Sequence, residues 1–213
     1  MEDIKLINGD SLQALKGYAD NHFDIAIVDP PYGVGDYFFK QMPIPKNQKK
    51  GLESKYKSKD WNIAPSKEYF NELMRVSKNQ IIWGGNYFLL PISRGWVYWD
   101  KQMGSGGLFS SGELAWTSFD KVLKSYSLCS RDGSNNGKDK IHPTQKPVQL
   151  YKWLLENYTN ENDLILDTHL GSGSIAIAAH YMKRKLIGYE IDKEYYDAAC
   201  KRFKEQTMQQ ALW

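Results

Sequence analysis

Four consecutive residues could take part in chemistry on an aromatic amine: Asp29, Pro30, Pro31 and Tyr32. An amino group on an aromatic ring is a poor nucleophile, because its lone pair is delocalised into the ring. Two acceptors aimed at the amine hydrogens would localise that lone pair, and the Asp29 carboxylate and the Pro30 carbonyl could form this pair. Tyr32 offers a flat face on which a base lifted out of a duplex could stack. The alternative is a turn that ends a strand and packs its tyrosine.

A second group of residues is typical of a nucleoside-binding loop. A short apolar segment ends at Asp167, and Gly171 and Gly173 then precede a helix of small residues. Glycine permits a tight turn and a close approach of the backbone to a ligand, and the start of a helix favours an anionic group. Glu190 ends the next strand, at the spacing of about 20 residues expected of a carboxylate that binds ribose hydroxyls. A G-x-G without a third glycine is a weak signal by itself, so a structural turn is the alternative.

The turn Asn8-Gly9-Asp10-Ser11 follows a short strand with alternating apolar residues. Asp10 therefore also lies at the carboxyl end of a strand, where ligands bind in open α/β sheets. The alternative is a capping role, because Asp10 or Ser11 could cap a helix over residues 12–18.

A lysine-rich stretch without hydrophobic periodicity covers residues 38–60, soon after the tetrapeptide. Only Glu53 and Asp60 oppose its lysines, so its net charge exceeds that of the whole chain, which is +3. We predict that this stretch contacts the phosphates of DNA. The candidate DNA-binding residues are Lys46, Lys49, Lys50, Lys55, Lys57 and Lys59. The alternative is a solvated loop, which is the commoner role of a run of like charges.

The elements that must position these residues alternate between strands and helices, which predicts an α/β fold with a mostly parallel sheet. Apolar runs at residues 23–28, 81–83 and 164–167 are typical of strands buried on both faces. Helical patterns cover residues 65–77, 147–158, 175–181 and 193–205. We also expect a hairpin over residues 113–126 and one antiparallel strand at the edge of the sheet.

The composition describes a globular chain of 213 residues with 41% hydrophobic and 25% charged residues, enough for one domain. The start shows no signal peptide, and no apolar run is long enough to span a bilayer. Cys129 and Cys200 stand far apart, and the histidines show no zinc-like spacing, so we expect a cytoplasmic protein without a metal site.

Taken together, these motifs resemble those of the amino-group DNA methyltransferases that use S-adenosylmethionine. Asp29-Pro30-Pro31-Tyr32 matches the catalytic motif of that family, and the stretch from Asp167 to Gly173 looks like its cofactor loop. Asn8-Gly9-Asp10-Ser11 is similar to the motif that faces the cofactor's adenine. His142-Pro143-Thr144-Gln145-Lys146-Pro147 looks like the motif that lines the methionine end. The catalytic motif precedes the cofactor motif, and this order is the circular permutation of the β group.

The resemblance implies a Rossmann-like fold of one domain over residues 1–213, with helices on both faces of a twisted, mostly parallel sheet. A small target-recognition region and the basic loop would lie within about residues 38–140. The implied cofactor is S-adenosylmethionine. The residues implied to bind it are Asp10, Ser11, Asp29, His142, Thr144, Lys146, Asp167, His169, Gly171, Ser172, Gly173, Ser174 and Glu190.

The implied reaction is site-specific methylation of the N6 amino group of adenine in double-stranded DNA, with the base flipped out of the helix. Adenine is favoured because an aspartate leads the tetrapeptide, whereas the N4-cytosine enzymes of this family more often carry serine. N4-cytosine is the alternative, followed by an RNA or a protein glutamine. Enzymes of this group occur in bacterial and phage restriction-modification systems, which leaves open a homodimer and a cognate endonuclease. Thr168 and His169 depart from the Pro-Phe that the family usually carries before its glycines.

Overall fold

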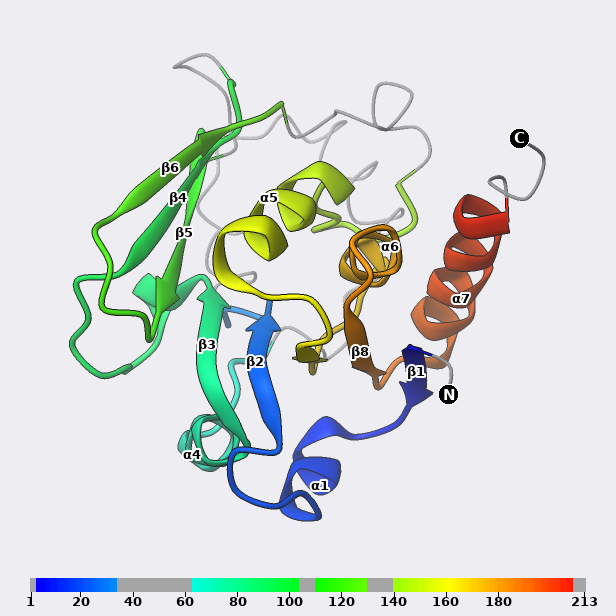
Figure 1. The fold of residues 1–213 in the computed structure, drawn as a ribbon, viewed down its shortest axis with the longest axis horizontal. Coiled ribbons are helices and arrows are strands. Elements are labelled where there is room, and N and C mark those ends of the chain that lie inside the picture. Colours follow the sequence, from blue (N-terminus) through cyan, green and yellow to red (C-terminus); the bar gives the residue numbers. More distant parts are fainter. Residues whose placement is uncertain (1–2, 34–62, 104–109, 130–139, 209–213) are drawn as a thin grey trace, which may run out of the picture.

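The computed structural model describes residues 3–33, 63–103, 110–129 and 140–208. Eight strands form one sheet in the order β1-β8-β7-β2-β3-β5-β4-β6 (Figure 1). The strands are β1 (Ile4–Asn8), β2 (Phe23–Val28), β3 (Ser77–Trp83), β4 (Trp96–Asp100), β5 (Gly112–Thr117), β6 (Lys124–Ser127), β7 (Leu164–Asp167) and β8 (Lys185–Glu190). The helices are α1 (Ser11–Lys16), α4 (Lys67–Val76), the 3-10 helix η1 (Gly85–Tyr87), α5 (Val148–Tyr158), α6 (Ser174–Tyr181) and α7 (Lys193–Met208).

Apart from Asp24, the strand β2 is apolar, because its two faces belong to two different cores. Ile25 and Ile27 pack in a cluster with residues of α5 and α6, whereas Ala26 and Val28 pack in a second cluster with residues of α1 and α4. Successive side chains of a strand point to opposite faces, so both faces of β2 must be covered. Helices α5, α6 and α7 accordingly cover one face of the sheet, and α1 and α4 cover the other (Figure 1).

The sheet is mostly parallel, as predicted, and β5 is the antiparallel strand among the described residues. It pairs with both β3 and β4, so it lies inside the sheet and not at the edge where we expected it. The predicted hairpin over residues 113–126 is wrong, because β6 does not pair with β5. It pairs in parallel with β4, on the edge of β4 that faces away from β5. Burial explains the difference: the second half of β5 is buried, whereas β6 is mostly exposed and polar and suits an edge position.

No helix in the described part of the chain is both long and apolar enough to cross a membrane. The described residues also contain no group of three or more histidine, cysteine, aspartate or glutamate side chains arranged to hold a metal ion.

Truncating Leu154, which is fully buried between α5 and the sheet, should destabilise the fold. We expect Leu154→Ala to lower the free energy of unfolding by about 2–5 kcal/mol, through lost burial and the cavity left behind. Urea denaturation followed by circular dichroism measures this change. Leu123→Ala is the control, since Leu123 is 55% exposed, and it should change stability by less than about 0.5 kcal/mol. Equal effects of the two substitutions would contradict the packing of α5 on the sheet.

Candidate active site

The carboxyl ends of β2 and β7 lie side by side, and the helices that follow these two strands pack on opposite faces of the sheet. The two strands pair in parallel, but α4, which follows β2, lies on one face, and α6, which follows β7, lies on the other. Crossover connections that leave neighbouring strands on opposite faces open a crevice at this edge of the sheet. Asp29 follows β2 directly and Asp167 ends β7, so the tetrapeptide and the glycine loop lie beside the same crevice.

The Asp29 carboxylate receives two donors. The Tyr32 hydroxyl donates to Oδ1 at 2.8 Å, and the Lys146 ammonium donates to Oδ2 at 2.5 Å. The same ammonium lies 3.0 Å from Oε2 of Glu113 on β5, whose Oε1 pairs with Lys101 at 2.5 Å. Lys101, Glu113, Lys146 and Asp29 therefore form a line of alternating charges, which we call the charge row. Their side chains are only 2–22% exposed, with Lys146 the most buried.

Burial and neighbouring charges set the ionisation of the charge row. Burial raises the pKa of Asp29 above its ordinary value, and Lys146 offsets this only in part. Burial alone would lower the pKa of Lys146, but Asp29 and Glu113 outweigh it and raise that pKa. Burial would raise the pKa of Glu113, but Lys146 and Lys101 outweigh it and hold the pKa at about 2. Lys146 is therefore a cation and Glu113 an anion at neutral pH, and each supplies the partner that a buried charge requires.

The ring of Tyr32 packs between the end of β3 and the helix η1. It lies against the backbone of Gly84, where a Cβ atom would come within 2.2 Å of a ring carbon. Gly84 also has a φ of +66°, so both the close approach and the conformation require glycine. Tyr87 stacks on Tyr32 with ring centroids 5.0 Å apart and an interplanar angle of 17°. Tyr87 therefore covers part of the Tyr32 ring, with the offset that this centroid distance implies.

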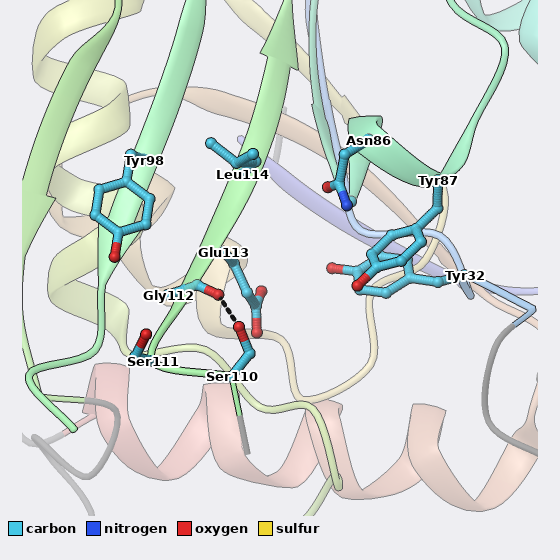
Figure 2. Close-up of a pocket in the computed structure, with 10 residues that line it drawn as sticks. Tyr32, Asn86, Tyr87, Tyr98, Ser110, Ser111, Gly112, Glu113 and Leu114 are labelled. Atoms are coloured by element: carbon cyan, nitrogen blue, oxygen red, sulfur yellow. Dashed lines mark hydrogen bonds between the residues drawn. The ribbon is translucent and has the colours of Figure 1, made fainter. Parts of the chain in front are cut away.

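A cavity of about 300 Å³ opens beside Tyr32 (Figure 2). Figure 2 shows the stacked rings of Tyr32 and Tyr87 on one side and the Glu113 carboxylate, which points toward the cavity, on the other. This volume lies at the lower end of the range for small-molecule pockets and suits a flat heterocycle. Its other polar lining residues are Asn86, Tyr98, Ser110 and Ser111.

Glu190 fixes the glycine loop from the end of β8. Its Oε2 accepts the backbone N–H of Gly171 at 2.8 Å, and its Oε1 accepts the N–H of Asp192 at 2.9 Å. Gly171 and Gly173 have φ values of +52° and +71°, a region that favours glycine. Each carboxylate oxygen has a second acceptor site, so Glu190 can hold the loop and still accept a ligand hydroxyl.

Arg202 on α7 braces the same loop from outside. Its Nη1 donates to the Ser172 carbonyl at 2.8 Å and to Oγ of Ser174 at 2.9 Å. The two serine hydroxyls lie 3.2 Å apart, and both residues are buried. Ser172 and Ser174 therefore serve the loop's own structure in addition to any role toward a ligand.

The segment before α5 lies over the glycine loop. The His142 ring would be 3.5 Å from a Cβ at Gly171, and Thr144 donates its backbone N–H and its hydroxyl to Nδ1 of His142. Burial lowers the pKa of His142 to about 4, and Lys146 adds to this effect. Ser174 Oγ donates to the Lys146 carbonyl at 2.7 Å. The backbone of Lys146 thus adjoins the loop, whereas its ammonium lies on Asp29 and Glu113.

Asp10 caps α1, the role that the sequence left as an alternative. Its Oδ1 accepts the Leu12 N–H at 2.8 Å, and Ser11 is the first residue of the helix. The Asn8 side-chain amide donates to the Glu190 carbonyl at 2.8 Å and so ties the end of β1 to the end of β8. Asp10 therefore lies at the same edge of the sheet as Glu190.

The residues that depart from the family pattern connect the loop to α4. Thr168 Oγ1 lies within hydrogen-bond distance of the Tyr69 hydroxyl, at 2.6 Å, and of Nδ1 of His169, at 2.9 Å. The His169 N–H donates to Oδ1 of Asp167 at 3.0 Å. Burial raises the pKa of Asp167 to about 8, partly offset by that N–H, and burial lowers the pKa of His169 to about 4. His169 is therefore neutral at neutral pH.

The structure brings the predicted residues of the tetrapeptide, the glycine loop and residues 142–146 to one edge of the sheet. Pro30 is buried and Pro31 is half-buried at this edge. The lysines predicted to contact DNA, Lys46, Lys49, Lys50, Lys55, Lys57 and Lys59, lie outside the described residues. Sequence reasoning missed the site residues Gly84, Asn86, Tyr87, Tyr98, Lys101, Glu113 and Arg202. Of these residues, only Gly84 could be found from its neighbours in the sequence, because it belongs to a Gly-Gly pair that ends an apolar run.

Replacing His169 with phenylalanine should reduce the acid sensitivity of the fold. The pKa of His169 is about 4 in the folded chain, against about 6.5 for an unperturbed histidine. Between these values the unfolded state binds more protons, so stability is lost as the pH falls. At pH 5 this should cost the wild type about 1–2 kcal/mol relative to pH 7.5, a loss that His169→Phe avoids. Urea unfolding at both pH values measures it, and the exposed His22, changed to Asn, is the control. Parallel pH dependences of wild type and His169→Phe would contradict the buried neutral imidazole.

Comparison with known families gives a match over most of the chain. The N6/N4 methylase family model, described as DNA methylase, matches residues 35–201. Among curated proteins, the chain is similar to the Type II methyltransferase M.HpaI of Haemophilus parainfluenzae, with 25% identity over 96% of this chain and 75% of that protein. It is also similar to the putative methylase YubD of Escherichia coli strain K12, with 25% identity over 97% of this chain and 93% of that protein.

Solved structures share the architecture at low sequence identity. The M1.HpyAVI–SAM complex gives a TM-score of 0.58 at 20% identity, covering 93% of this chain and 98% of that chain. The PvuII DNA methyltransferase, described as cytosine-N4-specific, gives a TM-score of 0.61 at 16% identity, covering 97% of this chain and 92% of that chain. At such identities the likeness concerns the fold.

Proposed function

Because the chain belongs to the N6/N4 DNA methylase family, we propose that it transfers a methyl group from S-adenosylmethionine to the N6 amino group of adenine in double-stranded DNA. Asp29 and the Pro30 carbonyl accept hydrogen bonds from the target amine, and Tyr32 contacts the flipped base. The target sequence is selected by residues within about 38–140, of which the described parts carry β3 to β6.

One residue supports this proposal more than any other, because it joins the two halves of the site. Lys146 accepts a hydrogen bond from Ser174, at the start of α6, through its carbonyl and places its ammonium on Asp29. The glycine loop contacts the backbone carbonyl of Lys146 and the Asp29 carboxylate contacts its ammonium, so the two halves of the site adjoin at this residue. A transfer between two ligands requires such proximity, because the reacting atoms must meet in line.

The glycine loop fits a nucleoside cofactor. Glu190 keeps one acceptor site on each oxygen for ribose hydroxyls. The next residue, Ile191, lies beside the carboxyl end of β8 with its side chain exposed, at 66% accessibility. Gly171, Gly173 and the start of α6 supply bare backbone at the crevice. S-adenosylmethionine, when bound there, supplies an electrophilic methyl group on a sulfonium.

The residues at Asp29 act mainly by position and electrostatics. The carboxylate draws one amine hydrogen toward itself, which localises the nitrogen lone pair for attack on the methyl carbon. As the N–C bond forms and the S–C bond breaks, the amine becomes acidic and its proton leaves toward Asp29 or water. Asp29 therefore need not be a strong base, but it must be ionised and within reach.

Double-stranded DNA is the proposed partner, and the lysines of residues 46–59 are proposed to contact its phosphates. The base would leave the duplex and enter the cavity beside Tyr32, which is lined by aromatic and polar side chains. A homodimer and a cognate restriction endonuclease stay predictions.

Asp29→Ala should abolish methylation and spare cofactor binding. Removal of the acceptor leaves the amine lone pair delocalised, so we expect the rate to fall by about 1,000-fold or more. Transfer of labelled methyl groups from S-adenosylmethionine to DNA measures the rate, and isothermal titration measures cofactor binding. Asp120→Ala is the control, because Asp120 forms an exposed pair with Arg94 and follows the end of β5 that lies away from the crevice. Full activity of Asp29→Ala would end the proposed mechanism.

Identification of the modified base tests the choice of adenine. Unmethylated genomic DNA is incubated with enzyme and labelled S-adenosylmethionine, digested to nucleosides and examined by mass spectrometry, while sequencing locates the modified sites. We expect N6-methyladenine at one short sequence. Detection of N4-methylcytosine would replace adenine by cytosine as the target base and leave the rest of the proposed function unchanged. Cofactor binding without any incorporation into DNA would point to RNA or protein as the substrate.

A further inference from the structure

The geometry points to Glu113 as a positioning residue for methyl transfer: it holds the Lys146 ammonium so that the Asp29 carboxylate can take up the target amine. This inference rests on the proposed function. Glu113 lies on β5, far along the chain from Asp29, and acts through Lys146, which lies within 3.0 Å of both carboxylates. It also lines the cavity beside Tyr32 (Figure 2).

The starting point is a competition at Asp29. Its Oδ2 accepts the Lys146 ammonium at 2.5 Å, and its Oδ1 accepts the Tyr32 hydroxyl at 2.8 Å. An ammonium is a stronger donor than the neutral amino group of a base, because its hydrogen bonds are charge-assisted. While Lys146 bonds so closely to Oδ2, it withdraws the electron density that the incoming amine needs.

Glu113 offers the ammonium another partner. Its Oε2 atom is buried and forms no hydrogen bond among the described residues, although it lies 3.0 Å from Nζ of Lys146. This oxygen is paired in charge with Lys146, but the geometry of the pair falls short of a hydrogen bond, so the oxygen is incompletely satisfied. A small rotation of the ammonium toward Glu113 would complete this bond and relieve Oδ2 of Asp29.

Glu113 is suited to this task because its own charge is fixed. Lys101 pairs with its Oε1 at 2.5 Å and leaves Oε2 to Lys146. The charge row contains two lysines and two carboxylates, so a shift of the ammonium from Asp29 to Glu113 moves no net charge into the interior. The shift therefore avoids the penalty of an unpaired buried ion.

The alternative is that the charge row serves stability alone. In that case loss of Glu113 would lower the stability of the fold, and further loss of Lys146 would lower stability and activity again. If Glu113 instead draws the ammonium from Asp29, its loss leaves Lys146 bound to Asp29 alone. Removing Lys146 as well would then restore part of the activity, because the competing donor is gone.

The test compares Glu113→Gln with the double variant Glu113→Gln, Lys146→Met in single-turnover methylation of unmethylated DNA. We expect Glu113→Gln to slow transfer by roughly 10- to 100-fold, as when one more charge-assisted hydrogen bond must be broken. The double variant should recover at least about tenfold of this loss. Rates are measured from pH 7 to 9, because Asp29 without Lys146 keeps only Tyr32 as a close donor, and burial then favours its protonated form.

Two controls separate positioning from folding. Urea unfolding should show some loss of stability for Glu113→Gln, because Lys101 loses its ionised partner, but titration with S-adenosylmethionine should give a near wild-type affinity. Glu68→Gln, which changes an exposed glutamate paired with Lys16, should leave the rate unchanged. If Glu113→Gln does not fold, Glu113→Asp takes its place, since it keeps the charge but retracts the acceptor and should give an intermediate rate.

A wild-type rate in Glu113→Gln would overturn the inference, and so would a double variant as slow as the single one. Both results would leave the proposed function standing, because wild-type enzyme would still methylate DNA. Failure of the wild type to methylate any DNA would instead overturn the proposed function, and this inference with it.

Discussion

The structure depends on one buried cation. The Lys146 side chain is 2% exposed, and an ammonium in that position requires ionised partners at close range. Asp29 and Glu113 meet this requirement only if the end of β2 and the start of β5 lie at the same edge of the sheet. The segment before α5, which carries Lys146, must lie over that edge. The topology of the sheet and the position of the Asp29 carboxylate are therefore parts of one electrostatic arrangement.

This constraint explains the antiparallel strand inside the sheet. A parallel strand in the place of β5 would bring its carboxyl end to the crevice, whereas β5 runs the other way and brings its first residues there. Gly112 and Glu113 stand at that start, and a Cβ at position 112 would come within 2.3 Å of the Tyr98 ring. The reversal of β5 thus allows a charged side chain near the start of a strand to reach the Lys146 ammonium, which also contacts Asp29.

The sequence predicts the parts of the site whose signals are local. The apolar run before Asp29 and the strand, glycine turn and helix around Gly171 show their structure within a few residues, and the sheet forms from them as predicted. Glu113 carries no such signal, because its partners Lys101 and Lys146 are brought to it by strand pairing. The predicted hairpin was wrong for the same reason: residues 113–117 and 121–126 resemble two strands joined by a short turn, and only the pairing of residues 112–117 with β3 and β4 decides their partners.

The two departures from the family pattern at Thr168 and His169 form a local substitute for the missing proline and phenylalanine. A proline at 168 could not bond to the Tyr69 hydroxyl, whereas Thr168 does so at 2.6 Å and thereby fixes the loop to α4. His169 packs edge-on against the same tyrosine with ring centroids 5.4 Å apart, much as a phenylalanine ring would. Because burial keeps the pKa of His169 near 4, the ring enters this contact uncharged. The loop is therefore held by an aromatic contact and a hydrogen bond, and neither requires a charge beside the site proposed for a sulfonium.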